Sequence, residues 1–130
     1  GRYDLAATTI TDTATGEQYA IFGGGRTDNT VTISDVIDAI KITSGKLSEP
    51  ITGKLSTVLE NLAATTIIDT TTGEQYAIFG GGNINLTTFT DVINAVKITN
   101  GKISDPITGK LSLARGYLAA TSVIDAVTGE

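Results

Sequence analysis

Internal repetition is the feature of this sequence that most constrains its fold. Residues Leu5–Gly25 return as Leu62–Gly82 with 19 of 21 residues identical, and Asp35–Ser56 return as Asp91–Ser112 with 17 of 22 identical. A third copy opens at Leu118 with the sequence LAATSVIDAVTGE. Self-similarity at a period of 56 or 57 residues marks an array of supersecondary units. The fold must therefore be one that a repeated unit can build.

The repetition divides the chain into repeat 1 at residues 5–61, repeat 2 at 62–117 and the start of a third repeat at 118–130. The two full copies differ mainly in two short segments, which are residues 26–34 and 57–61 of repeat 1. Loops vary more than the elements they connect. These segments are interpreted as loops, or alternatively as two adaptable patches on a constant scaffold.

Composition limits the chemistry that the chain can carry out. The sequence contains 23 Thr, 16 Ile and 15 Gly, and this mixture favours extended structure and tight turns. It contains no His, Cys, Met or Trp, so thiol chemistry, His-based triads and zinc sites of Cys or His are excluded. We therefore expect no enzyme. A small glycoside hydrolase with converging carboxylates ranks last among the hypotheses; the carboxylates available to it are Glu17, Asp38, Glu49 and Glu60.

Charge and hydropathy argue against two classes of partner. The net charge is −5, and the sequence has none of the basic stripes that nucleic-acid binding needs. No uninterrupted apolar run approaches the ~20 residues of a bilayer-spanning helix, so membrane insertion is not expected. A chain without oxidisable sulfur and rich in Thr, Ile and Gly is more typical of an extracellular or cell-surface protein than of a cytosolic enzyme.

Each repeat opens with the pattern of a β-hairpin. Ala7–Thr13 is a run of strand-forming residues, and Glu17–Phe22 is a second such run after a short turn sequence. Gly16 is expected in the left-handed conformation at this turn. Asp12 is expected to accept backbone N–H bonds there. The same pattern returns in repeat 2.

The apolar spacing then changes to one that is typical of a helix. Ile33, Val36, Ile37 and Ile40 stand at i, i+3, i+4 and i+7, and repeat 2 has the same spacing. Ser34 and Thr90 fit helix N-caps, and Gly45 and Gly101 fit the position just past a helix end. The sequence therefore predicts an α+β fold, mostly β, in which each repeat has a hairpin, a capped helix of about ten residues and short strands.

The segment Asp28–Lys41 resembles the loop–helix half of a dockerin, an EF-hand-like calcium module of secreted proteins. The resemblance places Asp35 at the last loop position and Asp28 at the fifth, and Asp91 is the corresponding acid of repeat 2. It implies calcium as the one candidate cofactor. Gly24 and Arg26 stand where ligands belong, and calcium needs six to eight oxygens. No cofactor is therefore expected.

The third copy suggests a mode of assembly. Residues 118–127 repeat the strand that opens the other copies, and a free strand of this kind would expose apolar side chains and an unpaired edge. Insertion into another copy would bury them by β-augmentation. The residues expected at this contact are Leu118, Val123, Ile124 and Val127.

The function that follows is a structural repeat protein. We expect an extracellular filament or surface layer in which copies of the chain join head to tail by strand exchange. The alternative is a dockerin- or adhesin-like module that binds another protein. Asn85-Leu-Thr87 matches a glycosylation sequon, which leaves modification of Asn85 open.

Overall fold

The computed structural model describes residues 1–27 and 32–130. Over these residues the fold is all-β, with twelve strands in four antiparallel sheets and no helix. None of the described residues therefore belongs to a helix that could cross a bilayer. The strands are β1 (Ala6–Asp12), β2 (Glu17–Gly23), β3 (Val36–Ile40), β4 (Ile42–Thr43), β5 (Lys46–Leu47), β6 (Ile51–Lys54), β7 (Ala63–Ile68), β8 (Gln75–Gly80), β9 (Val92–Val96), β10 (Ile98–Thr99), β11 (Lys102–Ile103) and β12 (Ile107–Lys110).

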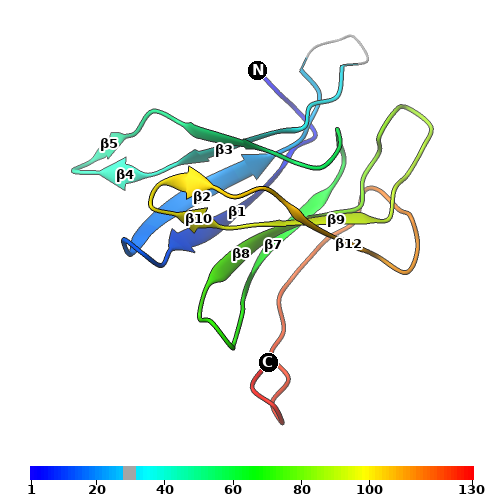
Figure 1. The fold of residues 1–130 in the computed structure, drawn as a ribbon. Helices are drawn as coiled ribbons and strands as arrows, with labels where there is room; N and C mark the ends of the chain where they lie inside the picture. The colour runs from blue at the N-terminus through cyan, green and yellow to red at the C-terminus, as the bar shows by residue number, and fades with distance from the viewer. Residues whose placement is uncertain (28–31) are drawn as a thin grey trace.

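Each repeat forms one four-stranded sheet (Figure 1). The first sheet has the order β1-β2-β3-β6 and the second has the matching order β7-β8-β9-β12. A two-stranded hairpin extends each of them, β4-β5 in repeat 1 and β10-β11 in repeat 2. The two repeats therefore build the same structure twice.

The predicted hairpin is confirmed in both repeats. In repeat 1 the register runs from Ala6 opposite Gly23 to Asp12 opposite Glu17. Gly16 lies in the left-handed region with φ +76°, and the Asp12 carboxylate accepts a bond from the Ala14 N–H at 3.0 Å. Asp69 accepts the equivalent bond from Thr71 in repeat 2.

The predicted α+β fold is wrong, because the segment expected to be a capped helix is a strand in both repeats. Val36–Ile40 is β3, which pairs with β2 on one side and β6 on the other. Ile37 and Ala39 are buried on one face of this strand, and Val36 and Ile40 lie half-buried on the other. A central strand with apolar residues on both faces produces the same spacing as a helix face. Two neighbouring strands complete its backbone hydrogen bonds, and β-branched residues suit this position.

The residues interpreted as helix caps serve turns instead. The Ser34 Oγ accepts a hydrogen bond from the Val36 N–H at 3.0 Å, just before the strand. Ser44 and Gly45 have φ of +52° and +76°, and Asn100 has φ +50° at the matching place in repeat 2. Positive φ at both central residues is the geometry of a tight hairpin turn. The glycine expected past a helix end therefore joins two short strands.

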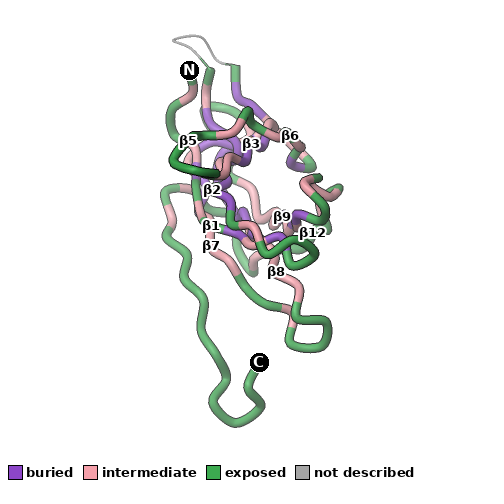
Figure 2. Tube along the Cα trace, turned by 90° about the vertical axis from the view of Figure 1, so that its left-hand side faces the viewer, coloured by how far each residue is buried: buried purple, intermediate pink, exposed green. Residues whose placement is uncertain are grey.

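The core lies between the two sheets. Buried residues line the space where the sheets face each other, and residues 118–130 are almost entirely exposed (Figure 2). Most of the buried apolar residues belong to one cluster that draws on both repeats. These include Ile10, Tyr19, Ile21, Ile37, Ala39, Leu55, Leu59, Leu62, Ala77, Phe79, Val96 and Ile98. Neither sheet has a core of its own, so each depends on the other.

Candidate functional site

The contact between the two sheets is the candidate functional site, here called the junction. Each sheet has two faces, named after an aromatic residue of β2 or β8. The Tyr face carries Tyr19 in the first sheet and Tyr76 in the second, and the Phe face carries Phe22 and Phe79. The junction brings the Tyr face of the first sheet against the Phe face of the second, so two different faces of the same unit meet.

Close packing at the junction depends on glycines of the first sheet. Gly23 leaves room for the Phe79 ring, because a Cβ at Gly23 would lie 2.7 Å from the Phe79 Cε1. Gly53 leaves room for Ile103 in the same way, because a Cβ at Gly53 would lie 2.6 Å from the Ile103 Cγ2. Contacts this short are not tolerated without movement of the neighbours. Phe79 and Ile103 are therefore seated in hollows that only glycine provides.

Polar bonds fix the position of one sheet on the other. The Asp12 Oδ2 accepts a hydrogen bond from the Gly101 N–H at 2.8 Å, and the Asn94 Oδ1 accepts one from the Ser56 N–H at 2.7 Å. The Thr11 N–H donates to the Gln75 Oε1 at 3.0 Å. These bonds join groups far apart in sequence and specify one relative placement of the sheets.

Asp12 holds the turn of its own hairpin and also the β10-β11 hairpin of the second repeat. Burial of this carboxylate favours a higher pKa, but hydrogen bonds from the backbone N–H groups of Gly101, Ala14 and others outweigh it. The pKa of Asp12 is therefore below its usual value of 3.8. Asp69, in the corresponding turn of repeat 2, has a lowered pKa because of the Thr71 N–H and neighbouring groups.

We expect Asp12→Asn to lower the free energy of unfolding at pH 7 by about 1.5–3 kcal/mol, the contribution of hydrogen bonds to a charged group. Because the folded pKa lies below 3.8, this stabilisation is complete above pH 3.8 and is lost as the pH falls through the folded pKa. Urea unfolding followed by circular dichroism at pH 7 and pH 3 measures both values. The variant should lose less stability than the wild type on acidification, and an equal loss would contradict this role of Asp12.

The segment that opens the third repeat meets repeat 2 in the way that repeat 2 meets repeat 1. The Gly25 N–H donates to the Leu59 carbonyl at 2.7 Å, and the Gly82 N–H donates to the Arg115 carbonyl at 2.8 Å. In the same ladder the Asn61 N–H donates to the Asp4 carbonyl, and the Tyr117 N–H donates to the Asn61 carbonyl, both at 2.9 Å. The linking geometry therefore recurs at every repeat boundary.

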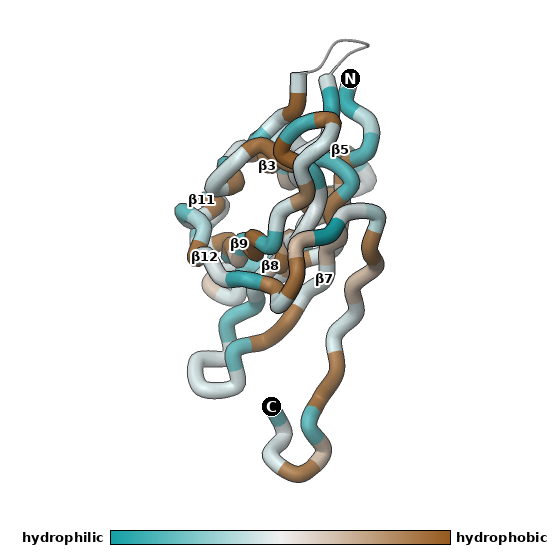
Figure 3. The backbone as a smooth tube through the Cα atoms, turned by 90° about the vertical axis from the view of Figure 1, so that its right-hand side faces the viewer, coloured by the Kyte–Doolittle hydropathy of each residue, from teal (hydrophilic) through white to brown (hydrophobic). Residues whose placement is uncertain are grey.

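Three of the four residues predicted for assembly are exposed along residues 118–130, here called the tail. Val123, Ile124 and Val127 are exposed, and Leu118 is half-buried beside Gly81. Over the described residues the tail pairs with no strand. It runs along β7, where it forms a groove with Thr66, Ile67 and Ile68. Figure 3 shows apolar stretches along the tail, outside the sheets.

The residues predicted as calcium ligands are not gathered into one site. Asp28 lies outside the described residues. Asp35 faces the Lys54 Nζ at 3.7 Å, and Asp91 faces the Lys110 Nζ at the same distance. Within residues 1–27 and 32–130, no three acidic side chains come together in a group that could hold a metal ion.

Three of the four carboxylates considered for hydrolysis are held by separate cations. Glu17 pairs with Lys41 at 2.6 Å, Asp38 pairs with Arg2, and Glu60 pairs with Arg26. Glu49 is exposed in the segment between β5 and β6. This arrangement suits structural ion pairs.

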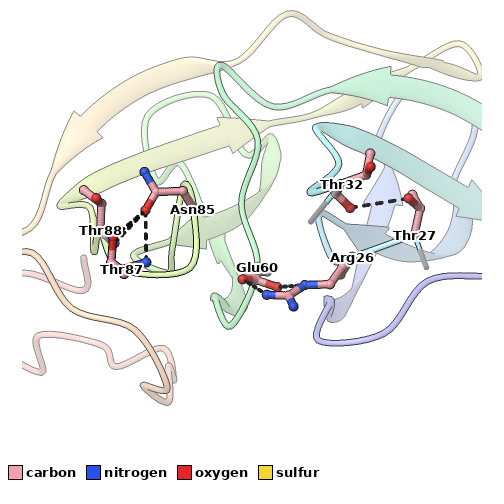
Figure 4. A network of polar contacts seen from close by, with 7 residues as sticks. All are labelled: Arg26, Thr27, Thr32, Glu60, Asn85, Thr87 and Thr88. Carbon is pink, nitrogen blue, oxygen red and sulfur yellow. Dashed lines mark hydrogen bonds and ion pairs between the residues drawn. The ribbon is translucent and has the colours of Figure 1, made fainter. Parts of the chain in front are cut away.

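The Arg26–Glu60 pair is a feature that sequence reasoning missed (Figure 4). Glu60 is buried, and both of its carboxylate oxygens accept bonds from the Arg26 guanidinium, with 2.7 Å between the Arg26 Nε and the Glu60 Oε2. The hydrogen bonds to Glu60 raise the pKa of Arg26 despite its partial burial. Glu60 lies in the linker between repeats and is replaced by Gly116 at the next boundary. That difference between repeats was the available signal.

Asn85 has a structural role in its loop. Its Oδ1 accepts hydrogen bonds from the Thr87 N–H at 3.0 Å and the Thr88 N–H at 2.9 Å (Figure 4). An asparagine oxygen that accepts such bonds stabilises a local turn. The loop that differs between the repeats is therefore ordered in repeat 2 by its own side chain.

The sequence matches no protein-family model and no curated protein.

Proposed function

We propose that this chain is an extracellular structural repeat protein, a segment or subunit of a self-assembling filament or surface layer. Copies of the chain join head to tail, and the tail of one copy enters the sheet of the next by strand exchange. The single observation that carries this proposal is the recurrence of the backbone bond that links repeats, since the bond to the Leu59 carbonyl returns at the Arg115 carbonyl. A contact between two different faces of one unit propagates unless it closes into a ring.

The tail supports strand exchange as the mode of joining. It repeats the sequence of β1 with 8 of 13 residues identical between residues 5–17 and 118–130. A strand so similar to β1 can replace β1 beside β2 of another copy in the same register, and the displaced β1 then leaves that edge. Burial of an aliphatic side chain contributes ~1.5–3 kcal/mol. In this register Val123 takes the place of the buried Ile10, and Ile124 takes that of the half-buried Thr11. Leu118 takes the place of the half-buried Leu5, whereas Val127 falls at Ala14, in the exposed turn.

We expect the full chain to assemble in a concentration-dependent manner and a variant without residues 118–130 to stay monomeric. The deletion should leave both sheets folded, because the tail contributes no strand to them. Analytical ultracentrifugation and negative-stain electron microscopy measure assembly, and circular dichroism checks the fold.

A matched control keeps the tail but replaces its exposed residues Val123 and Ile124 by serine. This variant should assemble weakly, because the apolar contribution is lost while the backbone edge remains. Assembly of the deletion variant at the wild-type concentration would contradict strand exchange. A full chain that remains monomeric at all concentrations would contradict the proposed function itself.

A further inference from the structure

The junction leaves two sheet faces uncovered, and they are of the same two kinds that meet at the junction. Repeat 2 presents a Tyr face, and repeat 1 presents a Phe face, with no second sheet of the described chain against either. A groove of about 220 Å³ on the open Tyr face is lined in part by Ile78, Gly80 and Ile93. A groove of about 470 Å³ on the open Phe face is lined in part by Phe22 and Leu47.

Exposure of equivalent residues shows what the open Phe face lacks. Ile98 is 2% exposed because the first sheet covers it, whereas Ile42, its equivalent in repeat 1, is 71% exposed. Leu47 stands at the position of Ile103 and is 73% exposed. The junction covers Phe79, Ile98 and Ile103 of repeat 2. Their equivalents in repeat 1 are exposed or half-buried; they are Phe22, Ile42 and Leu47.

The open Tyr face keeps the two hollows that receive such residues. Gly80 is the equivalent of Gly23, and a Cβ there would touch only Ile93 of its own sheet, at 3.6 Å. Gly109 is the equivalent of Gly53, and a Cβ there would have one neighbour, also in Ile93, at 4.0 Å. The hollows that hold Phe79 and Ile103 at the junction are therefore repeated in the second sheet and unfilled.

We propose that the open Tyr face binds the open Phe face of a second copy of this chain, with Phe22 seated over Gly80 and Leu47 over Gly109. The inference rests on the proposed self-assembly and names its surface. The occupant is a second copy because the receiving face and the entering face already meet once inside the chain. In such a contact the tail of the first copy takes the place of β1 in the second.

The charged residues at the proposed contact between copies also favour a second copy of the chain as the occupant. The Arg2 guanidinium pairs with Asp38 and donates to the carbonyl oxygens of Gly24 and Val36, each at 2.7 Å. Arg115 stands at the position of Arg2, two repeats further along the chain. When the tail replaces the first strand of a second copy, Arg115 replaces Arg2 beside Asp38 of that copy. At the internal junction the same two positions hold the neutral residues Leu59 and Asn94.

Disulfide trapping tests this contact, because the chain contains no cysteine of its own. At the junction a Cβ at Gly53 would lie 2.9 Å from the Ile103 Cβ, so the equivalent positions of two docked copies are close enough for a disulfide. The probe is the double variant Leu47→Cys/Gly109→Cys in the full chain. Its matched control is Leu47→Cys/Thr108→Cys, since Thr108 is exposed on the opposite face of the same strand.

Mild oxidation of the probe should give a ladder of covalent dimers, trimers and longer species on a non-reducing gel, at least tenfold more abundant than in the control. Gly80→Val, which fills one hollow, should reduce the ladder by a similar factor while the circular dichroism spectrum stays unchanged. Equal ladders in probe and control, or no ladder from the probe when the wild-type chain assembles, would overturn this interface and leave the proposed function standing. A wild-type chain that never assembles would overturn both.

Discussion

Phe79→Ala is expected to lower the free energy of unfolding by about 3–5 kcal/mol, the usual cost of truncating a buried phenylalanine. The Phe79 side chain is completely buried at the centre of the junction, over the hollow at Gly23. Gly23 has no side chain that could move into the space, so the cavity would remain. Removal of the Phe79 ring takes contacts away from both sheets at once. The two repeats should therefore still unfold together.

Phe22→Ala is the matched control for this substitution. Phe22 occupies the same position in repeat 1, but it is half-buried on the open Phe face. The variant should lose about 1 kcal/mol or less when the protein is monomeric. Urea unfolding of the two variants at low protein concentration gives the comparison. Similar losses in both would mean that the junction does not distinguish the two faces.

Glu60→Ala is expected to cost about 3 kcal/mol, near the lower end of what removal of one partner of a buried ion pair costs. The Arg26 guanidinium would lose both of its carboxylate bonds, and the penalty is limited because the Arg26 side chain is already 19% exposed. Glu60 also joins the repeats through its backbone, which exchanges two hydrogen bonds with Asn83. The substitution leaves those bonds in place and so isolates the side chain.

Lys54→Ala provides the comparison for an exposed pair. The Lys54 side chain is 74% exposed, and its Nζ lies 3.7 Å from Asp35. Its removal should change the free energy of unfolding by less than about 1 kcal/mol. Thermal and urea unfolding of both variants, at low and high salt, measure the difference. A loss on Glu60→Ala no larger than that on Lys54→Ala would show that the Arg26–Glu60 pair adds no net stability.

Turn chemistry made the hairpins predictable from sequence. The position of Gly16 requires a positive φ, and Asp12 has a side chain that can accept the N–H bonds of the turn, so two local signals agree. The glycines at 24 and 25 also adopt positive φ, where backbone segments approach closely. Signals of this kind depend on neighbouring residues only and survive in any tertiary context.

The helix prediction was wrong because the spacing of apolar residues does not show whether one face or both faces of the segment are covered. In β3, Ile37 and Ala39 are buried against the second sheet, and Val36 and Ile40 lie half-buried on the other face, so both faces carry apolar residues. The sequence of one repeat does not reveal this packing, because the sheet face that covers β3 belongs to the other repeat. The Arg26–Glu60 pair was hidden for a similar reason, as its members are 34 residues apart and Glu60 is positioned by its bridge to Asn83 of repeat 2.

The pairing of unlike faces has a consequence for length. However many sheets stack in this way, the row ends in one bare Tyr face and one bare Phe face. The free energy cost of exposing those two faces to water does not depend on the number of units, whereas every added unit contributes one more buried contact between sheets. The free energy of unfolding per unit should thus climb toward a plateau as the row grows, and a single sheet should be the weakest member of the series.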